Sequence, residues 1–119
     1  MLKLANALIN DFHGDWSKSS IKFFRSNGAY GYMIWLTLMS KHLEKKKISI
    51  EELVTCVAPY ASRRTVIDFI NKGIQGKFIK KINSNEDKRK NLVEPTDITI
   101  KEYSEWSNKF IKSIYNKNV

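Results

Sequence analysis

Apolar residues recur every three to four positions along the first third of the chain, which is the spacing of amphipathic helices. This spacing predicts one helix over residues 2 to 12, a short second helix within residues 16 to 28, and a longer helix from residue 29 to about residue 45. The third helix is apolar on most sides, so we expect other elements to contact it all round. Its inward stripe is formed by Tyr32, Trp35, Leu36, Met39 and Leu43.

Two shorter helical segments follow, and each begins with a residue that caps helices. Ser49 with Glu52 three positions later has the pattern of a capping box, and Ser62 is the N-cap of the second segment. That segment ends at Gly76, because glycine commonly follows the last turn of a helix. Two short helices joined by a few residues are typical of a helix-turn-helix, which we place at about residues 49 to 76.

The pattern then changes to short apolar runs separated by turn-forming residues. The run "KFIKKI", residues 77 to 82, predicts a strand, and "LVEP", residues 92 to 95, predicts the return strand of a β-hairpin. A last helix begins at Thr96 or Thr99 and continues to about residue 116. The predicted fold class is therefore mainly α with a small β-hairpin, in a single domain of 119 residues.

The composition is that of a folded chain, with 42% hydrophobic and 28% charged residues. Cys56 is the single cysteine, which excludes an internal disulfide and a thiolate zinc cluster; we expect a small buried thiol rather than a redox sensor. We expect no secretory signal at the start of the chain, and its most apolar run is far shorter than the roughly 20 residues that cross a bilayer. We expect a cytoplasmic protein with no membrane partner.

Catalytic and metal-binding motifs are absent from the sequence. His13 and His42 are far apart, and neither has a carboxylate at ligand spacing. Glu51 and Glu52 point about 100° apart on a helix, so they favour the helix dipole rather than form an acid and base pair. We therefore expect no enzyme activity, no cofactor and no metal.

Positive charge is concentrated in the middle of the chain. The formal net charge is +9, and residues 61 to 91 contribute +6, with nine lysines and arginines against three acids. A basic region of this kind is typical of a protein that binds nucleic acid. A solubilising lysine surface is the alternative.

The second helix of the pair carries a polar face opposite its apolar stripe. At about 100° per residue, burial of Val66, Phe69 and Ile70 turns the opposite face outward. Arginine pairs with guanine, asparagine pairs with adenine, and hydroxyls at a helix N-terminus bind phosphate. An ordinary solvated face is the alternative to a recognition helix. The predicted DNA-facing residues are Ser62, Arg63, Arg64, Thr65, Asp68, Asn71 and Lys72.

The run "NSNEDKRKN" places basic residues at the tip of the hairpin, which we interpret as a wing over about residues 77 to 95. A basic tip can reach the DNA backbone or a minor groove, where the negative potential favours arginine. Asp87 would repel DNA by itself, so we expect it to hold Arg89, or Arg63 of the recognition helix, in a fixed geometry. The predicted wing contacts are Lys88, Arg89 and Lys90.

The segment from Ser62 to Thr96 resembles the recognition helix and wing of the MarR family of winged helix-turn-helix transcriptional regulators. With the preceding helix, the similarity covers residues 48 to 96. The residues on which it rests are Ser62-Arg63, Thr65-Val66, Phe78-Ile79 after a helix-ending glycine, and Asp87-Lys88-Arg89 followed by Val93 and Thr96.

The resemblance implies a homodimer held by the terminal helices, at about residues 2 to 45 and 97 to 116, that binds a palindromic operator. It implies recognition helices in successive major grooves, with Arg89 of each wing, oriented by Asp87, in a flanking minor groove. We expect a repressor that occludes a promoter and is associated with the nucleoid. The alternative is a winged-helix module that binds proteins or organises DNA without sequence specificity.

The apolar residues of the last helix also predict a dimer, because one small domain could not easily cover all of them. The predicted interface residues are Tyr103, Trp106, Phe110 and Ile114. The resemblance leaves open whether a small-molecule effector binds between the dimer helices and the DNA-binding part. Tyr30 and Trp35 either line such a pocket or pack in the core, and their helical spacing favours the core.

Overall fold

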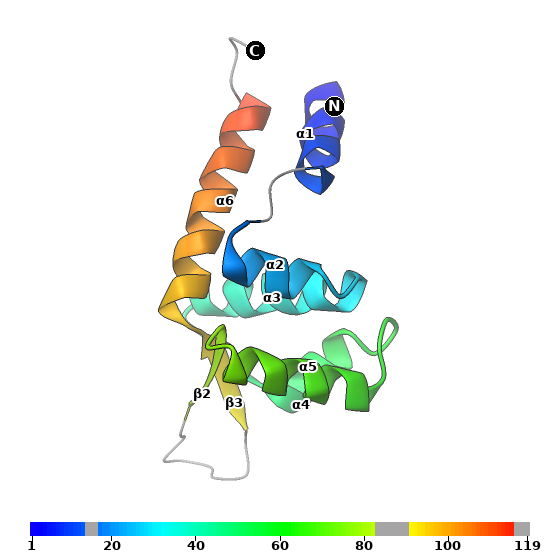
Figure 1. Ribbon diagram of the computed structural model, residues 1–119, viewed down its shortest axis with the longest axis vertical. Coiled ribbons are helices and arrows are strands. Elements are labelled where there is room, and N and C mark those ends of the chain that lie inside the picture. Colours follow the sequence, from blue (N-terminus) through cyan, green and yellow to red (C-terminus); the bar gives the residue numbers. More distant parts are fainter. Residues whose placement is uncertain (14–16, 83–90, 116–119) are drawn as a thin grey trace.

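The computed structural model describes residues 1–13, 17–82 and 91–115. Over these ranges the chain is mainly helical with a small antiparallel sheet, which confirms the predicted fold class (Figure 1). Every helix expected from the apolar spacing is present, with bounds close to those predicted. The elements in chain order are α1 Leu2–Phe12, α2 Ser19–Arg25, α3 Ala29–Leu43, β1 Ile48–Ser49, α4 Ile50–Cys56, α5 Arg63–Gln75, β2 Ile79–Ile82, β3 Leu92–Pro95 and α6 Asp97–Tyr115.

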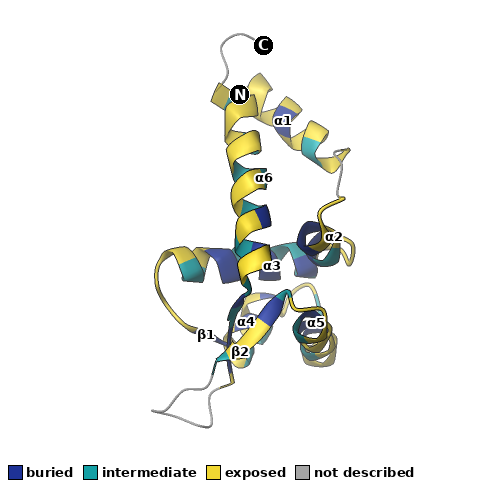
Figure 2. Cartoon of the chain, turned by 60° about the vertical axis from the view of Figure 1, so that its left-hand side comes forward, coloured by how far each residue is buried: buried dark blue, intermediate teal, exposed yellow. Residues whose placement is uncertain are grey.

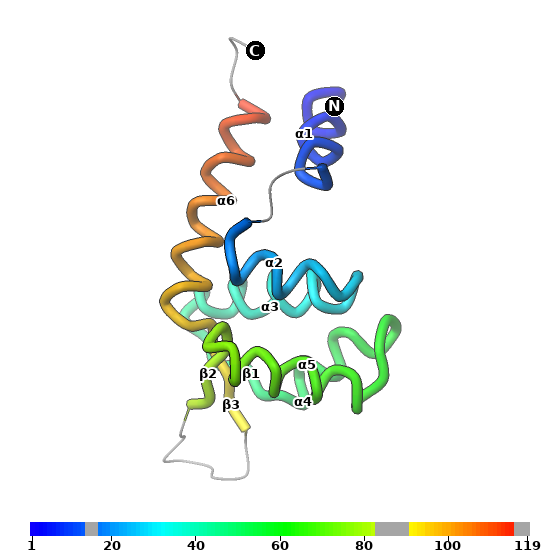
Figure 3. The backbone as a smooth tube through the Cα atoms, in the orientation of Figure 1, coloured from blue at the N-terminus to red at the C-terminus, as the bar shows by residue number. Residues whose placement is uncertain are grey.

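The elements form an elongated molecule that extends 52 Å along its longest axis and 27 and 25 Å along the others. Helix α6 runs from the sheet to the end of the molecule that is farthest from the hairpin, and α1 packs beside it there (Figures 1 and 3). Helices α2 and α3 form the middle layer, and α4 and α5 lie beneath them beside the hairpin. The helix pair and the hairpin are therefore at one end, and α1 and the C-terminal part of α6 are at the other.

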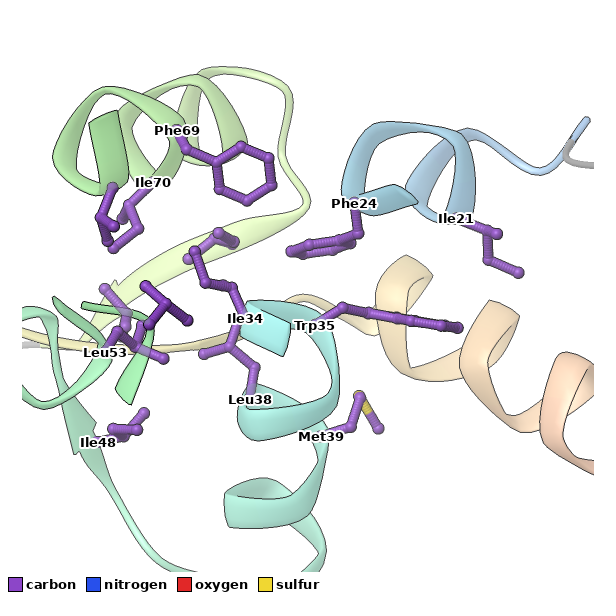
Figure 4. Packing of buried hydrophobic residues seen from close by; sticks show 14 residues of the cluster. Ile21, Phe24, Ile34, Trp35, Leu38, Met39, Ile48, Leu53, Phe69 and Ile70 are labelled. Carbon is purple, nitrogen blue, oxygen red and sulfur yellow. The ribbon is translucent and has the colours of Figure 1, made fainter. Parts of the chain in front are cut away.

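The hydrophobic core is built around α3 (Figure 4). Trp35 is fully buried, and its ring centroid lies 4.9 Å from that of Trp106 on α6. Tyr30, in the first turn of α3, packs edge-on against Phe69 of α5 at 5.5 Å between centroids. Tyr30 and Trp35 therefore pack in the core, as their helical spacing favoured.

The buried side of α3 differs in part from the predicted stripe. Trp35 and Met39 are buried as expected, whereas Tyr32 and Leu36 are half-buried. Leu43 is 63% exposed, so its predicted inward position was wrong. It stays exposed because it is the last residue of α3, where the chain turns back toward the sheet. The buried residues of α3 are Gly31, Ile34, Trp35, Leu38 and Met39.

Gly31 allows α2 and α3 to approach closely, because a Cβ at this position would overlap the carbonyl oxygen of Phe24. Gly31→Ala is expected to lower the free energy of unfolding by about 2 kcal/mol through overpacking, although alanine favours a helix more than glycine does. Urea denaturation measures the change. Gly73→Ala is the matched control, since its Cβ would meet the side chain of Ile79, which can shift, at 2.6 Å. Equal stability losses in the two variants would contradict this account.

The sheet has three strands in the order β1-β3-β2, and all neighbours are antiparallel. Strand β1 was not predicted, because two residues are too few to show the alternation that marks a strand. Ile48 pairs with Val93, and Ser49 pairs with Leu92. The backbone N–H of Ile50 then donates to the carbonyl oxygen of Asn91 at 2.9 Å. The start of α4 is thus bonded directly to the start of the return strand of the hairpin.

The predicted helix caps are confirmed. Ser49 Oγ accepts a hydrogen bond from Glu52 N at 3.1 Å, and Glu52 Oε1 accepts one from Ser49 N at 3.3 Å, which completes a capping box at α4. At α5, Ser62 Oγ accepts from Thr65 N at 3.2 Å. Each side chain satisfies a backbone N–H that would otherwise lack a partner in the first turn. The sequence pattern alone therefore located both helix starts.

Cys56 is exposed, so the expectation of a buried thiol was wrong. Helix α4 buries Leu53, and Val57 is buried directly after the helix ends. Cys56 lies in the last turn, on the side of α4 that these two residues leave to solvent. Apolar neighbours in the sequence did not indicate burial, because a short helix has only one inward side.

Candidate nucleic-acid interface

The polar face predicted for the recognition helix is exposed along the whole of α5. Figure 2 shows the exposed and buried sides of this helix. Its buried side consists of Val66, Phe69, Ile70 and Gly73. Because the exposed side is continuous, one partner molecule can contact several of its polar groups at the same time. The predicted residues Ser62, Arg63, Arg64, Thr65, Asp68, Asn71 and Lys72 are all exposed.

Aromatic packing holds α5 against the middle layer of the molecule. Phe69 stacks on Phe23 of α2 at 4.6 Å between ring centroids, and it also contacts Phe24 at 5.9 Å. Val66 and Ile70 are fully buried in the same cluster. Such a helix is rigidly supported from behind, which is what presents an exposed face in a fixed orientation.

Arg63, the first residue of α5, is held by Glu51 of α4. Arg63 Nη1 lies 2.6 Å from Glu51 Oε1 and 2.8 Å from Glu51 Oε2. The hydrogen bond from Arg63 lowers the pKa of Glu51, and the same bond raises the pKa of Arg63. Both side chains are exposed, so the pair can open at little cost. Sequence reasoning gave Glu51 only a helix-dipole role and missed this partner of Arg63.

The base of the hairpin is anchored beside α5. Ile79, Leu92, Val93 and Pro95 are buried, and Thr99 Oγ1 donates to the carbonyl oxygen of Phe78 at 2.8 Å. Two further basic side chains, Lys80 and Lys81, are exposed on β2; Lys80 Nζ lies 3.1 Å from Glu94 Oε1. The predicted tip residues Asp87, Lys88, Arg89 and Lys90 lie outside the described residues.

The last turn of α5 explains the glycine at its end. The N–H of Phe78 donates to the carbonyl oxygen of Gly73 at 2.8 Å, and Lys77 takes the left-handed conformation with φ 64°. Gly76 itself has φ −77°, so it is not the left-handed residue. A Cβ on Gly76 would lie 2.9 Å from the ring of Phe78, so a larger residue there would require that ring to shift.

No protein-family model matches the chain, and no curated protein matches it significantly. Among solved structures, the chain is similar to BpsR of Bordetella bronchiseptica, with a TM-score of 0.52 and 17% sequence identity. The similarity covers 95% of this chain and 77% of BpsR. The fold is a winged helix. The BpsR structure concerns the regulation of its DNA binding by 6-hydroxynicotinic acid.

In this winged helix, the predicted interface residues of α6 pack partly on the core of their own chain. The ring centroids of Tyr103 and Trp106 lie 5.5 and 4.9 Å from that of Trp35, and Trp106 stacks on Phe110 at 5.4 Å. Tyr103, Trp106, Phe110 and Ile114 are all half-buried. One domain therefore covers more of this stripe than we expected. Exposed apolar residues on α1 and α6 outside the predicted interface set include Leu2, Ile9, Phe12 and Ile111.

A buried ion pair joins α1 to α2 behind this aromatic stripe. Arg25 Nη1 lies 2.6 Å from Asp11 Oδ2, and the two side chains are only 4% and 13% exposed. Trp106 Nε1 donates to the other carboxylate oxygen of Asp11 at 2.7 Å. The guanidinium carbon of Arg25 lies 4.8 Å from the ring centroid of Tyr32, whose pKa is raised by burial and lowered in part by this cation. Four helices of the winged helix thus meet at one charged contact.

A second buried carboxylate, that of Glu102, joins α6 to the start of α2. Glu102 Oε1 accepts hydrogen bonds from the backbone N–H and the hydroxyl of Ser20, the former at 2.8 Å. Ser20 is fully buried, and Glu102 is 8% exposed. A carboxylate at a helix N-terminus is favoured by the helix dipole. Helix α2 has no side-chain cap of its own, so α6 supplies that role.

A cavity of about 280 Å³ lies between α1 and α6. Its apolar wall includes Trp106 and Phe110, and its polar groups include Asp11 and Asn10. At its edge, Lys18 Nζ lies 2.5 Å from Glu105 Oε2. The cavity is therefore suited to a small molecule with an apolar ring and polar substituents. Tyr30 and Trp35 do not line it.

Neither a helix that could span a membrane nor a metal-binding group of side chains occurs in the part of the chain that the structure describes. None of its helices is long and apolar enough to span a membrane. Its histidine, cysteine, aspartate and glutamate side chains form no group of three that could hold a metal ion. What the described surface does provide is the polar face of α5 beside a basic hairpin.

Proposed function

We propose that this chain is a sequence-specific regulator of transcription that binds double-stranded DNA, of the MarR type. The observation that carries the proposal is the exposed polar face of α5 on a helix that is capped, rigidly packed and adjacent to a hairpin. Helices of this kind enter the major groove, where arginine and asparagine read base edges. The formal net charge of +9 supports the same partner.

We propose that the protein binds its operator as a homodimer held by α1 and α6, so that a palindrome places one α5 in each half-site. Support comes from the exposed apolar residues Leu2, Ile9 and Phe12 on α1, which lie at the end of the molecule opposite the hairpin. A dimer joined there leaves both hairpins free for DNA. Bound across a promoter in the nucleoid of the cytoplasm, such a dimer represses by excluding polymerase.

We further propose that the cavity between α1 and α6 accepts a small-molecule effector. A ligand there would contact Trp106 and Asp11, which take part in the contact between α1, α2 and α6. A ligand that prefers one arrangement of these helices shifts the population of the DNA-binding form. BpsR, whose DNA binding is regulated by 6-hydroxynicotinic acid, is a structural precedent at low sequence identity.

Selection of bound sequences from a random duplex pool tests the proposed function. A palindromic consensus with half-sites about one helical turn apart is expected. Sedimentation of the free protein at micromolar concentration then measures the dimer. Enrichment of no sequence, together with no DNA binding at low salt, would exclude a DNA-binding regulator and leave a protein-interaction module.

Glu51→Gln is expected to strengthen binding to non-specific duplex DNA about threefold, because Arg63 is then free to contact phosphate and one negative charge is lost. The salt dependence of log K should become steeper by about 0.9, the amount for one added phosphate contact. Glu105→Gln is the control, since it removes the same charge from α6, where Glu105 forms an exposed pair with Lys18 of the α2 N-cap. An identical change in both variants would contradict a role for Glu51 at the DNA surface.

A further inference from the structure

A second pocket, lined by several lysines, lies at the C-terminal end of α3. It is a pocket of about 260 Å³ between the end of α3 and the sheet. We call it the lysine pocket. Its apolar floor includes Ile48 of β1 and Val93 of β3. Its lysines are Lys41, Lys45, Lys46 and Lys47.

Most of the positive charge in the lysine pocket is not neutralised. Residues 41 to 47 contain four lysines and one acid, Glu44. Glu44 Oε2 pairs with Lys46 Nζ at 3.1 Å, and Glu94, which also lines the pocket, pairs with Lys80 at 3.1 Å. Over the described ranges of the chain, the other three lysines of the pocket have no carboxylate within ion-pair distance. Among the described residues, the pocket therefore has more lysines than carboxylates to pair with them.

Lys45 occupies a backbone position at which glycine is favoured. Its φ is 60°, in the left-handed region, and the N–H of Lys46 donates to the carbonyl oxygen of Lys41 at 2.9 Å. This is the Schellman ending of a helix, where glycine avoids the steric penalty of a Cβ. A strained residue that persists is a reason to look for a role of its side chain. Here the strained residue brings an ammonium group to the rim of a basic pocket.

The lysine pocket is placed near the hairpin rather than near the recognition helix. In Figure 2 the turn between α3 and β1 lies on one side of the sheet, and α5 lies on the other side. Ile82, Val93 and Glu94 of the hairpin strands line the pocket. If a duplex contacts α5 and the hairpin together, the flank on the hairpin side is the part of it that lies nearest the lysine pocket.

We propose that the lysine pocket binds a phosphate group. Ammonium groups bind phosphate as point charges, and the lysine pocket brings several of them to one place. Two sources share this chemistry: the DNA backbone that flanks the hairpin, and a free nucleotide or inorganic phosphate. The DNA source rests on the proposed function, whereas the free-phosphate source does not.

The first arm of the test measures DNA binding by Lys45→Glu. Two duplexes are compared by fluorescence anisotropy, one that covers only α5 and the hairpin and one with longer flanks. Lys112→Glu, in the last turn of α6, makes the same change of charge and is the control. If the phosphate belongs to DNA, Lys45→Glu weakens binding of the longer duplex about tenfold more than the control does. The slope of log K against log salt concentration for that duplex also becomes shallower by about 0.9.

The second arm measures binding of inorganic phosphate and of adenosine monophosphate by amide chemical shifts. If the pocket binds a free ligand, the changes in amide chemical shift on addition of that ligand concentrate at residues 41 to 47. These changes are lost in Lys45→Gly. That variant is expected to melt at a higher temperature because glycine relieves the positive φ, so a folding defect cannot explain the loss. Lys77→Gly relieves the same strain at the end of α5 and should keep the shifts.

Dependence on Lys45 in either arm supports the phosphate site and identifies its source. If Lys45→Glu equals its control on both duplexes and no shift maps to residues 41 to 47, the assignment of the lysine pocket is wrong. DNA binding that is intact in that case leaves the proposed function standing. If the pocket binds free phosphate but the protein binds no DNA, the phosphate site is supported and the proposed function is wrong.

Discussion

Arg64→Ala is expected to weaken binding to the selected operator about 10- to 100-fold, which corresponds to about 1–3 kcal/mol for a lost bidentate contact with guanine. Arg64 is exposed on α5, away from the buried Val66 and Ile70, and it forms no ion pair with any residue that the structure describes. Its neighbour Arg63 is held by Glu51. Arg64 is therefore the arginine of α5 that is ready to contact a base. Fluorescence anisotropy at fixed salt measures the loss.

The matched variant Arg64→Lys separates base recognition from charge. Lysine keeps the positive charge, but it lacks the planar fork that pairs with guanine O6 and N7. Binding to a scrambled duplex should therefore stay close to that of the parent, while the preference for the operator falls. If Arg64→Ala binds operator and scrambled duplexes as the parent does, α5 is not the recognition helix.

Arg25→Met is expected to lower the free energy of unfolding by about 3 kcal/mol or more. The substitution removes the guanidinium that lies 2.6 Å from the largely buried carboxylate of Asp11, and removal of one member of a buried pair costs about 3–5 kcal/mol. It also removes the contact of the guanidinium with the ring of Tyr32. Thermal and urea unfolding measure the effect.

Arg63→Met provides an unusually close control for Arg25→Met. Both arginines place Nη1 2.6 Å from a carboxylate oxygen, but the side chains of Arg63 and Glu51 are 57% and 65% exposed. An exposed pair contributes at most about 1 kcal/mol, because water solvates both charges when the pair breaks. Similar losses of stability in the two variants would show that burial is not what makes the Arg25–Asp11 pair important.

The caps and apolar stripes of the sequence predicted most of the fold. Ser49, Glu52 and Ser62 located the starts of α4 and α5, because a helix cap is set by residues three positions apart. The same periodicity predicted that Arg64 and Asn71 would lie opposite the buried side of α5. These inferences depend only on local geometry, so one sequence is sufficient for them.

Contacts between distant parts of the chain could not be predicted in this way. Glu102 caps α2 through Ser20, which is 82 residues away in the sequence, and nothing in the local pattern of either residue indicates the pair. The pairing of Arg63 with Glu51 likewise depends on how α4 and α5 cross. The predicted role of Asp87 stays a prediction, since that residue lies outside the described ranges.

The bond from Ile50 N to Asn91 O has a consequence for how such a protein can evolve. Together with β1, it fastens the return strand of the hairpin to the start of α4. Insertions or deletions between Ile82 and Asn91 lie outside these paired residues, so they leave the position of α5 unchanged. Descendants of this chain can therefore lengthen or shorten the hairpin while α5 keeps its place against the core.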